Sequence, residues 1–145
     1  MRRRILIKGG LSHLLDLYTQ FKLKILSYNE KIKSTGYYVK PIHVTYKNSC
    51  GVKLKYVYFG RYWYRLSKRK ERITWVYVGK EKPDPSLPDP PLNPFEGVSV
   101  IVLNDEDIEV EVETLQLLAR IEQSIGQPGV FTKLLAENLS ESESR

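Results

Sequence analysis

The chain has 145 residues, 41% of them hydrophobic, which is enough for one compact domain with an apolar core and a small appendage. Its single cysteine, Cys50, excludes an internal disulfide and a zinc site built from cysteines, and it indicates a reducing, intracellular compartment. No apolar run approaches the roughly 20 residues of a membrane-spanning helix, and the opening apolar run is too short for a secretion signal. We therefore expect a soluble, cytoplasmic protein that has no membrane partner.

The net charge of +6 conceals two unequal parts. Residues 1–82 hold 20 Lys or Arg against 4 Asp or Glu, whereas residues 83–145 hold 3 against 13. The positive excess of the first part favours a polyanionic partner over neutralisation within the chain, because aromatic residues share its basic strands. The acidic second part either completes the core or masks the basic surface.

The first 36 residues predict a basic segment followed by a long helix. Three arginines at 2–4 precede an apolar triplet at 5–7, which fits a basic arm, a short edge strand or a frayed terminus. Apolar residues then recur at alternating spacings of three and four, so they form one stripe of a helix capped near Ser12 and ended near Gly36. We expect this stripe to cover the aromatic face of a sheet. Its members are Leu11, Leu14, Tyr18, Phe21, Ile25, Tyr28 and Ile32.

The residues after this helix predict antiparallel strands. Ile42, Val44 and Tyr46 alternate with polar residues, so a strand begins after Pro41, a residue that belongs at a sheet edge. A turn at 48–51 leads into a region where aromatic, basic and β-branched residues interleave at period two as far as Gly79.

Two further turns are expected in this region, one at Gly60 and one in a five-residue loop at 67–71. The result is a meander of three or four strands. Its predicted register places Trp63 opposite Trp75, and also opposite Tyr58.

The two faces of the meander differ in character. One is expected to be the core face and carries Leu54, Tyr56, Tyr58, Trp63, Ile73, Trp75 and Tyr77. The other is expected to be cationic and carries Lys53, Lys55, Tyr62, Tyr64, Arg72 and Thr74, with Val57, Phe59 and Val76 among them. The register across the turn at 48–51 leaves the face of His43 undecided.

The last third of the chain begins with a proline-rich strap, since six of the thirteen residues from 82 to 94 are proline. A hairpin closed at 104–107 follows, although a helix from Asp105 competes with it, and two helices begin near Glu113 and Val130. The predicted organisation is a basic helix-plus-meander domain at 1–82, a strap at 83–95, an acidic hairpin and helical segment at 96–139 packed on the first part, and a disordered tail at 140–145.

Cations and aromatic rings on one face are typical of nucleic-acid binding, because cations attract phosphates and rings stack on bases or wedge into grooves. We expect duplex DNA to be the favoured partner. In this hypothesis Lys68, Arg69, Lys70 and Arg72 contact phosphates, Lys53 and Lys55 extend the track, and Tyr62 and Tyr64 stack or wedge.

The sequence gives little support for a catalytic site or a metal site. Cys50 and His43 are the one thiol and imidazole close in sequence, but a turn cysteine beside a strand histidine is usually incidental. The acidic group at 105–109 lacks the glycine and distal glutamate of a calcium loop, and no glycine-rich phosphate loop is present. We expect no enzyme activity, no cofactor and no metal.

The segment GRYWYRLSKRKERITWVYVGKEKP, preceded by the long helix and by Cys50 and Gly51, resembles a family of small uncharacterised proteins from bacterial and archaeal mobile elements. The resemblance covers about residues 11–82. That family carries further cysteines before the hairpin, and their absence here bears against a metal site. The hairpin also resembles the three-stranded DNA-binding domain of phage-type integrases.

The sequence therefore predicts an α+β fold in which an antiparallel meander is backed by an N-terminal amphipathic helix and followed by an acidic hairpin and helices. The predicted function is non-enzymatic nucleic-acid binding in a mobile genetic element. The alternative is a protein-interaction or assembly module of a virus or plasmid, in which the aromatic face or the first helix builds a homodimer.

Overall fold

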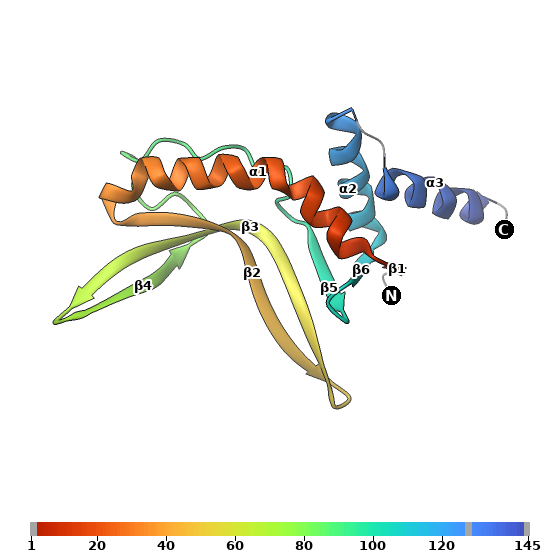
Figure 1. Cartoon of the computed structure of the whole chain (residues 1–145), viewed down its shortest axis with the longest axis horizontal. Helices are drawn as coiled ribbons and strands as arrows, with labels where there is room; N and C mark the ends of the chain where they lie inside the picture. The colour runs from red at the N-terminus through yellow and green to blue at the C-terminus, as the bar shows by residue number, and fades with distance from the viewer. Residues whose placement is uncertain (1–2, 127–128, 144–145) are drawn as a thin grey trace.

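One antiparallel sheet with helices packed on one face forms the body of the protein (Figure 1). The structure, a computed structural model, describes residues 3–126 and 129–143, with side chains as far as 138. In chain order its elements are β1 (Arg4–Ile7), α1 (Gly10–Ile32), the 3-10 turn η1 (Lys33–Thr35), β2 (Tyr37–Ser49), β3 (Val52–Arg69), β4 (Arg72–Gly79), β5 (Ser99–Leu103), β6 (Asp107–Glu111), α2 (Val112–Ser124) and α3 (Val130–Glu143). The strands lie in the order β1-β6-β5-β3-β2, and β4 also pairs with β3. The predicted α+β class and the helix-backed meander are confirmed.

Helix α1 forms because its apolar residues follow the helical period, and six of the seven predicted stripe residues are buried. The seventh, Leu11, packs at the edge of the same core. The helix begins differently from the prediction, since its N-cap is Gly9 in a left-handed conformation and the Ser12 hydroxyl donates to the Gly9 carbonyl. Gly10 allows this end to lie against β6, because a Cβ there would sit 2.6 Å from Ile108.

The expected turn at Gly60 is wrong, because β3 runs unbroken from Val52 to Arg69. Gly60 lies inside the strand, where a side chain would meet the ring of Tyr62 at 3.3 to 3.4 Å. Its role is therefore to let the Tyr62 ring lie over the backbone, which is a common reason for glycine within a strand. The meander consequently has three strands, β2, β3 and β4.

The observed register differs from the predicted one, because β3 is continuous at Gly60 and its loop to β4 has two residues instead of five. Trp63 lies opposite Gly79, and Leu66 lies opposite Trp75, so the expected pairing of the two tryptophans is wrong. Trp63 is fully buried under Tyr28 of α1, with ring centroids 6.2 Å apart. Trp75, by contrast, is 49% exposed and does not belong to the core.

Two hairpins extend beyond the body and diverge from the region below α1 (Figure 1). The β2–β3 hairpin closes at Cys50 and Gly51, whose φ angles of 51° and 78° fit a two-residue turn of the mirror-image type. The β3–β4 hairpin closes at Lys70 and Glu71, a shorter loop than predicted. Strand β2 is an edge strand, and its register shifts beside Pro41, as suits a proline in a sheet.

The acidic part of the chain completes the core. Strand β5 pairs with β3 and with β6, and β6 pairs with β1, so the predicted acidic hairpin is an integral part of the sheet. The N-terminal triplet is thus an edge strand, and Arg4 lies 3.7 Å from Glu109 on β6. Buried side chains from this part join those of α1 in one cluster, and they include Val98, Val100, Ile108, Val110, Leu115, Leu118 and Phe131.

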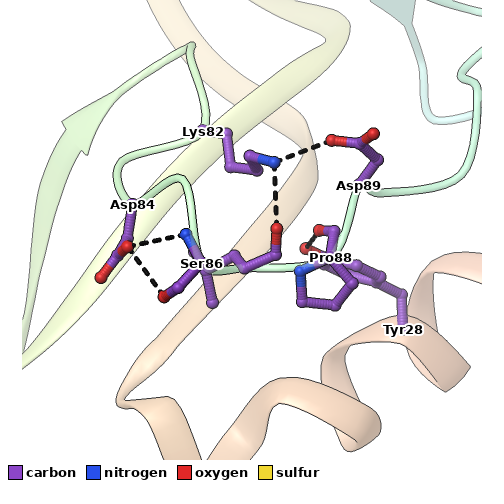
Figure 2. Close-up of polar contacts among 7 residues, drawn as sticks. Tyr28, Lys82, Asp84, Ser86, Pro88 and Asp89 are labelled. Atoms are coloured by element: carbon purple, nitrogen blue, oxygen red, sulfur yellow. Dashed lines mark hydrogen bonds and ion pairs between the residues drawn. The ribbon is translucent and has the colours of Figure 1, made fainter.

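The proline-rich strap crosses α1 and the middle of β3 and is fixed there by polar contacts (Figure 2). The Tyr28 hydroxyl donates to the Pro88 carbonyl at 2.6 Å, and Lys82 donates to the Asp89 carboxylate at 2.8 Å. Two of the strap's own residues, Leu87 and Phe95, are buried in the core. The hydrogen bond from Lys82 lowers the pKa of Asp89. The strap is therefore an ordered cover of the core.

Buried Glu122 on α2 holds the start of α3. Its carboxylate accepts hydrogen bonds from the backbone N–H groups of Gly129, Phe131 and Thr132, and from the Thr132 hydroxyl. Such a carboxylate satisfies the free donors at a helix N-terminus. Helix α3 continues to Glu143, into the tail predicted as disordered, and residues 144–145 lie outside the described ranges. Within those ranges no helix has the length and apolarity needed to cross a membrane.

Candidate nucleic-acid interface

The face of β2, β3 and β4 that points away from α1, which we call the outer face, carries most of the exposed rings of the sheet. Side chains alternate along a strand, so the even-numbered residues Tyr56, Tyr58, Tyr62 and Tyr64 share one face of β3. Trp63, of opposite parity, points into the core. Cross-strand pairing adds residues of β2 and β4 to the same outer face.

Eight rings form a continuous series on the outer face, which we call the aromatic row. In spatial order they are Trp75, Tyr38, Tyr64, Tyr77, Tyr62, His43, Tyr58 and Tyr56. Neighbouring ring centroids lie 4.6 to 6.5 Å apart, which is the range of favourable aromatic contacts. The series crosses three strands, so it covers the sheet from one hairpin toward the other.

A cavity of about 500 Å³ opens in the middle of the aromatic row. Its lining consists of His43, Tyr58, Tyr62, Tyr64, Tyr77 and Lys80, with no carboxylate among them. Burial, together with the neighbouring tyrosines, raises the pKa of Tyr62, and burial next to Tyr64 raises that of Tyr38. These phenols therefore stay neutral at physiological pH and do not repel an anion.

Lysine side chains flank the aromatic row. Lys47 lies 4.5 Å from the Tyr56 ring centroid and 3.3 Å from the Tyr58 hydroxyl, and Lys80 lies 6.0 Å from the Tyr62 centroid. Residues 37–80 contain eleven Lys or Arg and one acidic residue, Glu71. A surface of this charge attracts polyanions over a Debye length.

The structure divides the eight predicted contact residues into three groups. Tyr62 and Tyr64 lie in the aromatic row. The predicted phosphate contacts Lys68, Arg69, Lys70 and Arg72 are exposed at the end of the β3–β4 hairpin. Lys53 and Lys55 lie on the β2–β3 hairpin, where Lys53 is 4.7 Å from the Tyr46 ring centroid.

The predicted division of the two faces is corrected at several positions. Lys53, Lys55, Val57 and Phe59 have the parity of buried Trp63, so they lie on the α1 side and not beside Tyr62 and Tyr64. Arg72, Thr74 and Val76 pair with odd-numbered residues of β3, so they also lie on that side. Residues assigned to the core face instead belong to the aromatic row or are exposed; these are Tyr56, Tyr58, Ile73, Trp75 and Tyr77. The errors before Gly60 follow from the turn expected there, which inverts the face of every earlier residue. The errors at Ile73, Trp75 and Tyr77 follow from the five-residue loop expected at 67–71, because the shorter loop places Trp75 opposite Leu66 and not opposite Trp63.

Sequence reasoning missed six further row residues as contacts: Tyr38, His43, Tyr56, Tyr58, Trp75 and Tyr77. A signal for part of this set is present in the sequence, since tyrosines stand at 56, 58, 62 and 64 with Gly60 between them, all of one parity. The pairing of Tyr38 with Tyr64 and of His43 with Tyr58 depends on the shift beside Pro41, which the sequence does not specify.

Cys50 and His43 do not approach each other as a catalytic pair would. Cys50 is exposed at the hairpin turn, whereas His43 lies seven residues back along β2, roughly 20 Å away at about 3.3 Å per residue. Among the described residues, no three His, Cys, Asp or Glu side chains gather as a metal site would require.

Comparisons of the chain with protein families, with curated proteins and with solved structures find no match. The resemblances of the basic hairpin to mobile-element proteins and to integrase domains therefore stay predictions.

Proposed function

We propose that this protein binds nucleic acid, without catalysis, through the outer face of β2, β3 and β4. The observation that supports this most strongly is the aromatic row, which lies on a basic surface and surrounds a cavity without carboxylates. Rings in the core would be expected to pack against α1. These rings are instead turned away from α1, where they stabilise little of the fold and are available to a ligand.

The two hairpins give the proposal its phosphate contacts. Exposed cations lie at their ends, and the two hairpins extend beyond the body in different directions (Figure 1). A polymer lying along the row would place its phosphates near Lys47 and Lys80, and its continuation would reach Lys68 and Arg69. Duplex DNA is the partner predicted from the sequence, and titrations with duplex, single strand and RNA would compare the three directly.

We expect the affinity to fall with salt because bound phosphates release counterions. If the β3–β4 hairpin neutralises about four phosphates, log affinity falls with log salt at a slope of about −4 on duplex DNA. Replacing Lys68, Arg69 and Lys70 by alanine should reduce the slope to about −1. The melting temperature should hardly change, since exposed charges contribute little to stability. Fluorescence anisotropy at several salt concentrations measures the slope.

A matched control removes the same charge elsewhere. Lys22, Lys24 and Lys31 are exposed on α1, on the side of the sheet away from the aromatic row. Replacing these three by alanine should preserve most of the slope. An equal reduction of the slope in both variants would mean that only the net charge of the protein matters. An affinity that does not change with salt concentration would contradict the proposal.

A second candidate function, homodimer assembly through α1, is favoured by one observation. Leu15, Leu23 and Leu26 are 45%, 64% and 54% exposed on this helix, and a cavity of about 490 Å³ separates α1 from the β2 edge. Sedimentation equilibrium is expected to show a dimer that dissociates when Leu26 is replaced by glutamate. A monomer at all concentrations would exclude this candidate and leave nucleic-acid binding unaffected.

A further inference from the structure

A second, smaller cavity adjoins the cavity of the aromatic row. It measures about 310 Å³ and lies where β3 passes from its pairing with β5 to its pairing with β4. The two cavities share Tyr58, Tyr62 and Lys80 among their lining residues. They are therefore neighbouring halves of one recess, and each has a volume in the range of small-ligand sites.

The two halves differ in chemistry. The larger half is lined by five aromatic rings, counting His43, and by Lys80. The smaller half adds a second cation, Arg61, whose Nε is buried and has no hydrogen-bond partner among the described residues. A buried guanidinium nitrogen without a partner is costly, and a ligand oxygen would satisfy it. Among the described lining residues of this half, Glu96 is the one carboxylate, and the two cations outnumber it. Beside the hydrogen bond from Lys82, the charge of Arg61 also acts on Asp89 of the strap and helps to lower its pKa.

We infer that this recess binds one unpaired nucleotide of a single-stranded nucleic acid. The base lies against the rings of the larger half, and the phosphate lies between Lys80 and Arg61 in the smaller half. This inference rests on the proposed function and narrows its substrate class, because a base within a duplex has both its faces covered by neighbouring bases. Only an unpaired base offers a free π-face to tyrosine rings.

The arrangement of Tyr62 supports a preformed site. Its ring contacts His43 and Tyr77 at centroid distances of 5.3 and 6.5 Å, and it lies over the side-chain-free backbone of Gly60. Lys80, 6.0 Å from this ring, marks the junction of the two halves. Because the ring is held by the strand itself, a base binds with little loss of side-chain freedom.

The test compares three labelled ligands of equal length by fluorescence anisotropy: a single-stranded oligonucleotide, the same strand with abasic residues, and a duplex. The abasic strand keeps the phosphates but offers no ring to stack. We expect the intact strand to bind about 5- to 150-fold more tightly than the abasic strand, the range that stacking of one base provides. It should also bind more tightly than the duplex.

Tyr62→Leu and Tyr77→Leu should each remove most of this difference between intact and abasic strands. Tyr77 is half exposed, so its replacement leaves the core intact even if Tyr62→Leu weakens the fold. Tyr46→Leu is the matched control, since Tyr46 is a similarly exposed tyrosine on the α1 side of β2. In that variant the difference should persist.

The outcomes separate this inference from the proposed function. Equal, salt-dependent affinity for intact strand, abasic strand and duplex would overturn the single-nucleotide recess and retain nucleic-acid binding by the basic surface. An intact-strand preference that survives both tyrosine replacements would also overturn the recess. Failure to bind any of the three ligands would overturn both proposals.

Discussion

Truncation of the chain after Lys82 is expected to abolish folding. The deletion removes more than half of the buried apolar residues among those described, including the fully buried Leu115, Leu118 and Phe131. It also removes β5 and β6, which leaves residues 55–58 of β3 unpaired on one edge and β1 without a partner. Half a core cannot offset the conformational entropy of ordering the rest, because native stability is a small difference between large terms.

Circular dichroism and a melting curve on residues 1–82 would test this expectation. We expect no cooperative transition and, at higher concentration, aggregation through the uncovered stripe of α1. The control shortens the β3–β4 hairpin by replacing 68–73 with Asn-Gly, which removes exposed residues alone and should leave a cooperative transition. A folded fragment that binds nucleic acid more tightly than the full chain would instead assign the acidic part a masking role.

Trp63→Ala is expected to lower the free energy of unfolding by about 3 to 5 kcal/mol, the usual cost of emptying a large aromatic site in a core. Trp63 is completely buried and contacts Tyr28 edge to face. Its indole Nε1 has no hydrogen-bond partner among the described residues, so the loss is one of packing and not of a hydrogen bond.

Trp75→Ala is the matched control, since Trp75 is half exposed and contacts mainly Tyr38 at 4.6 Å between centroids. Its replacement should cost about 1 kcal/mol. Urea denaturation followed by circular dichroism measures both variants, and Trp63→Phe provides a milder substitution if Trp63→Ala does not fold. Equal losses at the two tryptophans would contradict the placement of Trp63 inside and Trp75 outside.

The parts of the fold that were predictable are those with a strong local period. The stripe from Leu14 to Ile32 identifies α1 and its buried face, and the alternation from Ile108 to Glu113 identifies β6. The predicted start of α2 near Glu113 is within one residue of the observed start at Val112. In each case the side-chain pattern and the burial arise from the same backbone geometry.

The register of the sheet was not predictable in this way. A glycine within a run of strand-forming residues is compatible with a turn, and equally with a continuous strand in which an aromatic ring lies over the glycine. Whether Gly60 is a turn or part of a strand decides which face of the sheet every earlier residue occupies. The contact between Gly60 and Tyr62 is set by tertiary packing beside the strap, where Asn93 donates to the Gly60 carbonyl at 3.0 Å.

The candidate site was therefore only half accessible to sequence reasoning. Its composition, tyrosine with lysine, was recognised, and Tyr62 and Tyr64 were identified. The recess itself depends on His43 and Lys80, which come from distant parts of the chain and meet only across the paired strands. The sequence spacing of these two residues does not predict that they lie together.

The pairing of β1 with β6 has a consequence for the order in which the chain folds. Arg4 lies opposite Glu111, so the first strand of the chain finds its partner more than a hundred residues later. Closing so long a loop costs entropy before any contact offsets it, and such pairings form late. The local hairpins β2–β3 and β3–β4 require no such closure. During synthesis, the basic strands β2, β3 and β4 can therefore pair before β6 exists. Strand β1 stays unpaired until β6 has been synthesised.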